Sequence, residues 1–364
     1  MKILGLMTGT SMDGLDCIYV DINVDKHYNL KYDILDYNTY PFTKSIRKLI
    51  YNSIGDLKSK ISNCCNEELG KFFLDKTKIF LNNNKVDLIS MHGQTISHIN
   101  NVKSIQIGTP KYLYHYFKIP VYYDFRSYDI LLGGSGAPLI PFLDWLLFKN
   151  SKIDIITLNL GGIANITYLP KQCSRDDVIG FDTGPGMCLI DEYMNFKFNL
   201  EFDNKGNTAS KGKINKELLL YLLKDKFVNK SYPKSTSREN FGVLYIKKTI
   251  NKFPNVNKYD FLRTLVSYTA TSIFCNVEKL ISNKSNFNLI LSGSGTKNLL
   301  LLDDIKKIFS KNNVCTINDY NIDVDIKEAL LMAIMGATKY KNIDNNMPSV
   351  TGAKKYASYG SIYE

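Results

Sequence analysis

The fold is decided by a stretch close to the N-terminus, Lys2-Ile-Leu-Gly-Leu-Met-Thr-Gly-Thr-Ser-Met-Asp-Gly-Leu-Asp-Cys-Ile-Tyr-Val-Asp-Ile-Asn-Val24. Residues 2–7 form a largely apolar run, and apolar side chains alternate over 18–24, so both segments are predicted to be strands. Between them, residues 8–16 are rich in Gly, Thr, Ser and Asp, which are turn-forming residues. The sequence therefore predicts a β-hairpin whose connection carries glycines and hydroxyl groups.

The remainder of the first half is predicted to alternate between helices and strands. The expected elements are helices over about 44–54 and 66–82, a buried strand over 86–91, and shorter strands near 105–107 and 121–125. The buried strand ends in His92-Gly-Gln-Thr95. The strand at 121–125 leads into Arg126, Asp129 and a Gly-Gly-Ser-Gly turn.

From about residue 151 the pattern begins again. Two strands joined by Gly161-Gly162 predict a second glycine-turned hairpin. The expected elements are strands over 153–159, 163–169, 178–181 and 287–291, and helices from about 187, near 215–226, 260–282 and 325–341. The last helix is apolar almost all round, which is typical of a helix buried between layers. The sequence thus predicts two α/β halves.

Length and composition agree with a two-domain globular protein. The chain has 364 residues, of which 44% are hydrophobic and 22% charged, and domains average about 150 residues. The net charge of +11 comes mostly from scattered lysines, because only five arginines occur. No run of five or six basic residues and no nucleic-acid-binding motif is present. We therefore expect no nucleic-acid partner.

Cysteine usage and hydropathy indicate a soluble cytoplasmic protein. The seven cysteines are odd in number and include no CxxC pair, which is typical of a reduced compartment. The apolar stretch over 130–148 contains three glycines, two prolines and Asp144, so no membrane span is expected. The N-terminal apolar run is too short for a signal peptide.

Two loops have the composition of phosphate-binding loops. The segment Gly9-Thr-Ser-Met-Asp-Gly14 offers backbone N–H groups and hydroxyls, and Asp13 and Asp16 can position Mg²⁺ through its waters. A tight hairpin turn is the alternative. The loop Ser292-Gly-Ser-Gly-Thr-Lys-Asn298 follows a strand and opens a helix, as nucleotide loops do, although a plain turn fits equally. Without a Walker A sequence, a P-loop NTPase is excluded.

Two carboxylates are candidates for catalysis. Asp182 is predicted to end a buried strand, where α/β folds bind ligands, and its alternative is a turn cap. Glu328 is the carboxylate that enters the apolar C-terminal helix, and its alternative is a capping box with Asp325. His92, Gln94, Arg126 and Asp129 are each predicted to follow strands, where they would offer polar groups to a polyhydroxylated or acidic ligand.

Read together, these segments resemble the anhydro-N-acetylmuramic acid kinase family over nearly the whole chain. The opening motif is Gly5-Leu-Met-Thr-Gly-Thr-Ser-Met-Asp-Gly-Leu-Asp16. The other motifs that carry the resemblance are His92–Thr95, Asp124–Asp129, Gly133–Leu139, Asn159–Thr167, Gly180–Gly186, Asp203–Gly206, Lys234–Glu239, Ser292–Asn298, Lys327–Ala329 and Pro348–Gly352. The combination is more specific than any single motif.

The resemblance implies a two-domain actin-like or hexokinase-like (ribonuclease H-like) α/β ATPase fold with an interdomain active-site cleft. We expect the first domain over 1–130, completed by about 342–364, and the second over 131–341. The implied cofactors are ATP and Mg²⁺, and the implied assembly is a homodimer. The nucleotide would contact Gly9, Thr10, Ser11, Met12, Asp13, Gly14, Leu15, Asp16, Gly161, Gly162, Gly293, Gly295 and Asn298, with Asp13 and Asp16 near the metal.

The implied reaction, in peptidoglycan recycling, opens the 1,6-anhydro bridge with water and phosphorylates O6. Asp182 would be the general base and Glu328 a second carboxylate, with His92, Gln94, Arg126 and Asp129 contacting the sugar. The sequence departs from the family pattern at Thr8, where the family has Ser, and at Ser135, where Gln is common. It also departs at Met187, where Asn is usual, and at Ser237, where Gly is usual. The loop Ser292-Gly-Ser-Gly replaces a more glycine-rich run. The alternatives are another sugar kinase of the superfamily, acting on a free hydroxyl, and a non-catalytic ATP-dependent sensor or scaffold.

Overall fold

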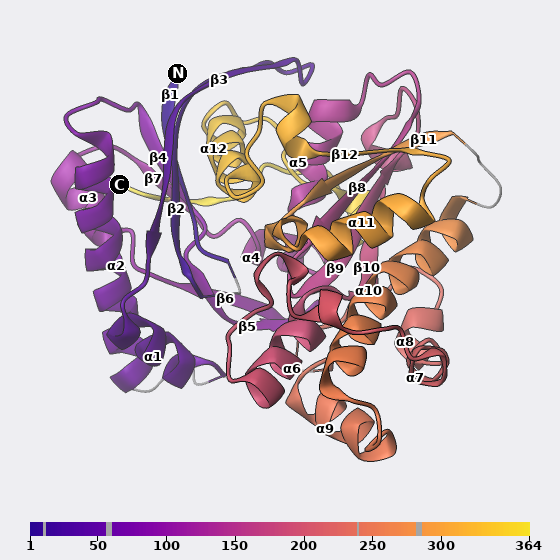
Figure 1. Cartoon of the computed structure of the whole chain (residues 1–364). Helices are drawn as coiled ribbons and strands as arrows, with labels where there is room; N and C mark the ends of the chain where they lie inside the picture. Colours follow the sequence, from indigo (N-terminus) through magenta and orange to yellow (C-terminus); the bar gives the residue numbers. More distant parts are fainter. Residues whose placement is uncertain (10–11, 56–59, 239, 282–285) are drawn as a thin grey trace. The chain divides into compact units, whose positions relative to one another are not determined.

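The computed structural model describes residues 1–9, 12–55, 60–238, 240–281 and 286–364. Figure 1 shows the course of the chain. It divides into two compact units, the first made of Met1–Lys149, Ser174–Val178 and Ile326–Glu364, the second of Asn150–Cys173 and Ile179–Asp325. The first unit therefore extends beyond the expected boundary at 130. It also includes the helix over 327–340, which had been expected in the second domain.

The first unit is built on a six-stranded mixed sheet. In spatial order its strands are β13 (Ser361–Tyr363), β7 (Val121–Tyr123), β4 (Leu88–Met91), β1 (Lys2–Met7), β2 (Gly14–Val24) and β3 (Leu30–Pro41). The strands β1, β2 and β3 form an antiparallel meander, and β4 and β7 continue the sheet parallel to β1. The predicted opening hairpin is confirmed.

Helices cover both faces of this sheet. The other described elements of the unit are α1 (Lys44–Ser53), α2 (Lys60–Leu81), α3 (Lys111–Phe117), α4 (Ser127–Leu131), α5 (Ile140–Phe148), α12 (Lys327–Tyr340), α13 (Pro348–Thr351), the short 3-10 helix η1 (Arg175–Asp177) and the ribbon of β5 (Gln94–Ile99) and β6 (Lys103–Ile107). Leu4 and Leu6 belong to the core cluster that contains the apolar residues of α2. Gly5, which points to the other face, contacts α12. In Figure 1, α2 and α12 accordingly lie on opposite sides of this sheet.

Two glycines allow α12 to approach the sheet closely. A Cβ atom at Gly5 of β1 would lie 2.4 Å from the carbonyl oxygen of Ala329, and one at Gly336 would lie 2.5 Å from Cβ of Ser90. The Ser90 hydroxyl donates a hydrogen bond to the Met332 carbonyl at 2.5 Å. Since these contacts bring the backbone of the helix directly against β1 and Ser90, they fix the position of the helix that carries Glu328.

The start of α12 is held by a buried ion pair. Lys327 Nζ lies 2.6 Å from Asp144 Oδ1 on α5, and both side chains are almost completely buried. Ile326 is the N-cap residue and makes no side-chain cap, so Glu328 is the second helical residue. The alternative interpretation of Glu328 as part of a capping box with Asp325 is therefore wrong, because the helix begins two residues later than the sequence suggested.

The second unit repeats the strand pattern of the first. Its sheet has the order β10 (Ile179–Pro185), β9 (Ile163–Leu169), β8 (Asp154–Leu160), β11 (Phe287–Ser292) and β12 (Asn313–Thr316). Here β8, β9 and β10 form the antiparallel meander, and β11 and β12 run parallel to β8. Each unit thus contains the three-plus-two strand order of the ribonuclease H-like fold, as predicted.

Six helices of the described residues complete the second unit. They are α6 (Cys188–Phe198), α7 (Lys216–Leu222), α8 (Lys226–Asn229), α9 (Val243–Lys252), α10 (Lys258–Ile281) and α11 (Leu299–Ile308). The long helix α10 supplies many buried residues of the core and packs on α6, α7, α11 and β10. Across the described parts of the chain, no helix combines the length and apolar character that a membrane crossing requires.

Two predicted positions of site residues are corrected by the structure. The strand β10 does not end at Asp182 but continues through Pro185, with a register shift between Asp182 and Gly184. This strand is the edge of its sheet, where a proline and a bulge are tolerated. Asp129 does not follow a strand directly but lies within the short helix α4.

The close approach of α12 predicts that Gly336→Ala destabilises the protein. Alanine favours a helix over glycine by about 1 kcal/mol, but overpacking against Ser90 costs about 2 kcal/mol. We expect the melting temperature, measured by calorimetry, to fall by about 2 to 4 °C. As a control, Tyr340→Ala at the end of the same helix, where the side chain is 59% exposed, should change it by less than about 1 °C. A more stable Gly336→Ala protein would contradict the close contact.

Candidate functional site

The connection between β1 and β2 holds the first predicted phosphate loop. Thr10 and Ser11 lie outside the described residues. Met12 has a left-handed backbone (φ 55°), and its N–H donates to the Gly9 carbonyl at 3.2 Å. Leu15 is 1% exposed and belongs to the core, so only its backbone can face a ligand.

The two carboxylates of this loop differ in their surroundings. The Asp13 side chain is exposed. The backbone carbonyl oxygen of Asp13 accepts hydrogen bonds from the N–H of Phe42 at 2.9 Å and from the Arg47 side chain at 3.3 Å. Asp16 lies on β2, and its Oδ1 accepts a hydrogen bond from Thr39 at 2.6 Å. No cluster of three metal-ligating side chains occurs among the described residues. Asp13 and Asp16 are carboxylates of the kind that can hold Mg²⁺ through its waters.

Two buried polar side chains lie beside the loop. Gln94 is 0% exposed, and its Nε2 donates to the Gly9 carbonyl at 3.2 Å. Its Oε1, and the Oγ1 of Thr8, have no hydrogen-bond partner among the residues that the structure describes. A buried polar atom left unpaired costs about 1 to 3 kcal/mol. Both atoms are therefore placed to pair with a bound molecule at the loop.

His92 holds Arg126 and is itself buried. Its Nδ1 lies 2.7 Å from the Gly93 carbonyl, and Arg126 Nε donates to its Nε2 at 2.9 Å. These two partners require the neutral tautomer with the proton on Nδ1. Burial, together with the positive charge of Arg126, lowers the pKa of His92 to about 3. His92 is therefore neutral at physiological pH and acts by orienting the guanidinium.

Arg126 remains charged in this environment. Its Nη1 donates to the Gly136 carbonyl at 2.8 Å. Burial lowers the pKa of the guanidinium to about 10, while the carboxylates of Glu328, Asp129 and Asp124 oppose that shift. A fixed and partly buried guanidinium is suited to bind the carboxylate of a ligand.

Asp129 occupies a structural position. It is 0% exposed, and its carboxylate accepts hydrogen bonds from Gly136 N–H at 2.7 Å, Thr351 hydroxyl at 2.8 Å and Tyr359 hydroxyl at 2.6 Å. These bonds tie the glycine-rich turn after α4 to the C-terminal segment. Asp129 therefore supports the turn that Arg126 also contacts, and its carboxylate does not face solvent.

Glu328 lies in the same part of the first unit as Arg126 and Asp13. Burial raises the pKa of its carboxyl group. The charges of Arg126 and Lys327 oppose this shift, and the carboxylate of Asp13 adds to it. Carboxyl groups with raised pKa values are characteristic of sites that exchange protons with a substrate.

A cavity of about 380 Å³ opens beside His92 in the first unit. Its wall includes His92, Gly93, Asp124, Ser127 and the strand and turn over 104–110. The lining is about equally polar and apolar, and Asp124 supplies its single carboxylate. Such a wall suits a polyhydroxylated molecule better than a highly charged one.

In the second unit, strand register aligns a row of polar side chains. Asp182 on β10 pairs with Asn165 on β9, and Asn165 pairs with Asn159 on β8. Ser292 on β11 is the parallel partner of Asn159. Since directly paired residues point to the same face of a sheet, these four side chains share one face. Sequence reasoning had selected only Asp182, because register between strands is not visible in a single sequence.

The Asp182 carboxylate is held through one oxygen. Its Oδ2 accepts hydrogen bonds from the Ser235 hydroxyl at 3.0 Å and the Thr236 N–H at 2.8 Å. Burial raises the pKa of Asp182, although these two donors and the charge of Lys234 act in the opposite direction. Chemically, it is a carboxylate whose proton affinity is increased by burial, as suits a general base. Ser235 and Thr236 were part of a recognised motif but had been given no role.

The glycine loops of the second unit contact each other directly. A Cβ at Gly293, whose φ is 85°, would lie 2.5 Å from Asn159 Oδ1, and one at Gly295 would lie 2.8 Å from the Leu160 carbonyl. The Gly162 carbonyl at the β8–β9 turn accepts hydrogen bonds from the N–H groups of Gly186 and Cys188. Glycine is required where the two loops meet, because any side chain would separate them.

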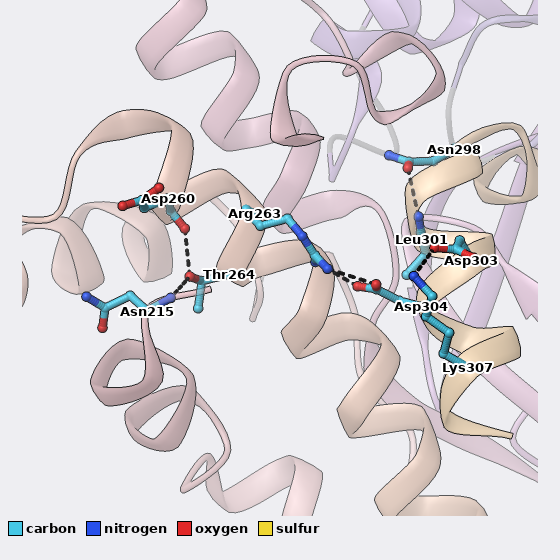
Figure 2. Close-up of polar contacts among 9 residues, drawn as sticks. All are labelled: Asn215, Asp260, Arg263, Thr264, Asn298, Leu301, Asp303, Asp304 and Lys307. Carbon is cyan, nitrogen blue, oxygen red and sulfur yellow. Dashed lines mark hydrogen bonds and ion pairs between the residues drawn. The ribbon is translucent and has the colours of Figure 1, made fainter. Parts of the chain in front are cut away.

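Asn298 closes the second loop at the start of α11. Its Oδ1 accepts a hydrogen bond from Leu301 N–H at 3.0 Å, which Figure 2 shows beside the Arg263–Asp304 ion pair between α10 and α11. Its buried Nδ2 has no hydrogen-bond partner among the described residues. The Asn298 side-chain oxygen therefore caps the helix, and its side-chain nitrogen could donate to a ligand.

The departures from the family pattern keep the loops intact. The Met187 N–H donates to the Gly161 carbonyl at 2.9 Å, and its side chain packs in the core beside Gly295. The Ser135 hydroxyl donates to the Ala137 carbonyl at 2.5 Å and closes its own turn. Met187 thus exchanges an amide for an apolar contact without disturbing the backbone of the hairpin.

The predicted residues fall into two groups. Those described in the first unit are Gly9, Met12, Asp13, Gly14, Leu15, Asp16, His92, Gln94, Arg126, Asp129 and Glu328. Those in the second unit are Gly161, Gly162, Asp182, Gly293, Gly295 and Asn298. Each group includes a glycine-turned hairpin at the end of a sheet and one carboxylate whose pKa is raised.

Two ribonuclease H-like units with these hairpins define the class of actin-like and hexokinase-like ATPases and kinases. A family model described as "Anhydro-N-acetylmuramic acid kinase" matches residues 1–364, and the chain belongs to this family. Proteins named anhydro-N-acetylmuramic acid kinase are similar over the full length. The protein from Clostridioides difficile is 37% identical and is covered over 98% of its length, with 100% of this chain.

Two further relatives bear the same name. The protein from Caldanaerobacter subterraneus subsp. tengcongensis is 35% identical, with 99% of this chain and 96% of that protein covered. A protein from Bacillus cereus is 33% identical, with 100% of this chain and 99% of that protein covered.

The hydrogen bonds of His92 predict its tautomer. Long-range ¹H–¹⁵N spectra, with the signal assigned by its loss in His92→Asn, should show a neutral ring protonated at Nδ1 throughout pH 5 to 8. Replacing Arg126 by methionine removes the charge that lowers the pKa, so the His92 pKa should rise in that variant. A His92 ring that titrates near its ordinary value of about 6.5 in the unaltered protein would contradict this arrangement.

Proposed function

We propose that this protein uses ATP to open 1,6-anhydro-N-acetylmuramic acid and to phosphorylate it at O6, yielding N-acetylmuramic acid 6-phosphate in the recycling of the cell wall. The observation that carries the proposal is the Asp182 carboxylate, which has a raised pKa and is held by donors on one oxygen, within a chain that matches the family over residues 1–364. The names of the relatives supply the substrate.

The chemistry needs one strong base. Asp182 takes a proton from water as the water oxygen attacks C1, and the C1–O6 bond breaks. O6 attacks the γ-phosphorus of ATP, and ADP leaves. Glycoside hydrolysis ordinarily requires a second carboxyl group to protonate the leaving oxygen. Here phosphorus captures that oxygen, so a single general base is sufficient.

The first unit supplies the groups that bind the sugar. Arg126 is the partner of the lactyl carboxylate, because His92 and the Gly136 carbonyl fix its guanidinium. Glu328 holds the sugar or the attacking water, and Gln94 offers its unpaired Oε1 to a hydroxyl. His92, which also lines the cavity, orients Arg126, and Asp129 orients the turn after α4. A contact of either residue with the sugar stays a prediction.

The nucleotide is bound by backbone groups of the glycine loops. The segment Gly9–Gly14, including Thr10 and Ser11, contacts the phosphates, together with the Gly161–Gly162 turn. Gly293, Gly295 and the free side of the Asn298 amide face the nucleoside. Asp13 and Asp16 hold Mg²⁺ through its waters, and the ion supplies positive charge that neutralises the phosphate oxygens.

A cytoplasmic location, expected from cysteine usage and hydropathy, and a homodimer, expected from the family resemblance, stay predictions. All seven cysteines are free, which agrees with a reducing compartment.

Purified protein should consume ATP only when the anhydro sugar is present. The measurement is a coupled ADP-release assay with Mg-ATP and the anhydro sugar, run beside N-acetylmuramic acid as the ring-opened control. The expected product carries one oxygen from labelled water at C1, because hydrolysis accompanies phosphorylation. Unchanged anhydro sugar after prolonged incubation would refute the proposal, and a product without the label would indicate a kinase that acts on a free hydroxyl.

Asp182→Asn should abolish turnover without loss of ATP binding. Removing a general base lowers kcat by roughly 10²- to 10⁴-fold, while the Kd for Mg-ATP, measured by calorimetry, should stay within about threefold of the original because Asp182 does not bind the nucleotide. The matched control is Asp303→Asn, which alters an exposed ion pair on α11 and should leave kcat unchanged. Near-normal turnover by Asp182→Asn would assign the base elsewhere, with Glu328 the next candidate.

A further inference from the structure

The segment Lys234–Thr236 runs along the open edge of the strand that carries Asp182. The strand β10 is the edge of its sheet, so its outer backbone groups have no neighbouring strand. The Asp182 N–H donates a hydrogen bond to the Lys234 carbonyl at 3.2 Å. The segment therefore takes the place of a further strand at this one residue. We call Lys234–Thr236 the Asp182 strap.

The strap donates hydrogen bonds to only one of the two oxygens of the Asp182 carboxylate. Ser235 and Thr236 both donate to Oδ2, one through its hydroxyl and one through its backbone N–H. Oδ1 accepts no hydrogen bond from the described residues. A carboxylate rotates about its terminal bond unless it is held, and two donors on one oxygen fix that rotation. Oδ1 is thus the oxygen left to accept a proton.

The strap is anchored by a buried lysine. Lys234 is 5% exposed, and its Nζ donates to the carbonyls of Phe227 at 2.9 Å and Val228 at 3.1 Å. The Val228 carbonyl also accepts a hydrogen bond from Asn276 of α10. The anchor therefore connects the strap to the short helix α8 and to the longest helix of the core.

The charge on Lys234 depends on its neighbours. Burial lowers its pKa to about 8, and the charges of Lys279 and Lys230 act in the same direction. The carboxylates of Asp182 and Asp225 oppose that shift. In return, the Lys234 charge and the two hydrogen bonds lower the pKa of Asp182 against the effect of burial. The lysine and the aspartate are therefore linked both through the backbone and through their charges.

We propose that Lys234, Ser235 and Thr236 are positioning residues for the general base, which fix the Asp182 carboxylate so that Oδ1 faces the attacking water. The proposal rests on the role of Asp182 given above. It assigns a function to a motif that had been recognised but not explained. The strap does not touch the substrate and acts only through the orientation and the proton affinity of Asp182.

The first test is the pH profile of kcat/KM for Ser235→Ala. Loss of one donor raises the pKa of Asp182, and the base must be deprotonated to work. The acidic limb of the profile should therefore move to higher pH by about 0.5 to 1 unit. Ionisation of the substrates affects the profiles of Ser235→Ala and of the unaltered protein equally, so it does not contribute to the difference between them. Ser235→Thr, which keeps the hydroxyl, should restore the limb, and the exposed Ser231→Ala should not move it.

The second test removes the anchor. Lys234→Met should lower kcat by roughly 10- to 100-fold, as expected for a displaced catalytic group, with KM for both substrates within about twofold. Lys234→Arg should recover part of this loss, because it restores donors to the Phe227 and Val228 carbonyls. Since the lysine is buried, circular dichroism and melting temperature must show that each variant is folded. If Lys234→Met is unfolded, Ser235→Ala decides alone, because Ser235 is exposed.

The outcomes separate this proposal from the assignment of the base. If Asp182→Asn is inactive and Ser235→Ala leaves the acidic limb unmoved, the strap does not tune the base and this inference is overturned. If Asp182→Asn keeps near-normal turnover, the role of Asp182 itself is wrong. A shifted limb in Ser235→Ala with an unshifted limb in Ser231→Ala supports the strap.

Discussion

The packing of α12 against the first sheet is the contact on which the first unit depends. Gly5 of β1 and Gly336 of α12 let the helix approach the sheet at distances that no side chain at these two positions would permit. The Lys327–Asp144 pair then fixes the beginning of the helix in a dry environment. Breaking a buried pair by removing one partner leaves an uncompensated charge, which is strongly destabilising. Glu328, the next residue, therefore has a defined position because its neighbours on both sides are immobile.

Asp129 and Asp182 differ in the number of carboxylate oxygens that accept hydrogen bonds, and this difference distinguishes a structural carboxylate from a reactive one. Asp129 accepts hydrogen bonds at both oxygens from three donors and is inaccessible to solvent. Asp182 accepts hydrogen bonds at one oxygen only. Both follow the same rule, that a buried carboxylate must be paired. The difference is that Asp182 keeps one oxygen for another partner. Burial raises its pKa, and the two donors and the charge of Lys234 oppose that shift.

The sequence predicted local features well and long-range features poorly. The strands over 2–7 and 163–169 were placed to the residue, because short apolar runs bounded by turn-forming residues are a local signal. The end of β10 was misplaced, since Gly-Pro-Gly suggests a loop unless the strand is known to be an edge. The burial of Asp129 was invisible, because its partners Thr351 and Tyr359 lie more than 200 residues away in the chain. The row from Asn159 to Asp182 likewise required strand register.

The first unit is made of three stretches of the chain, so it cannot be completed until the last of them has been synthesised. Residues 150–325 contain all five strands of the second sheet, whereas α12 and β13 lie in the stretch 326–364. During translation the second sheet is therefore complete while the face of β1 that carries Gly5 is still uncovered and β7 still lacks its neighbour β13. The first unit therefore begins with the residues that are synthesised first but cannot be completed until the last stretch is synthesised. A nascent chain that stops before residue 326 would leave the face of β1 that carries Gly5 uncovered.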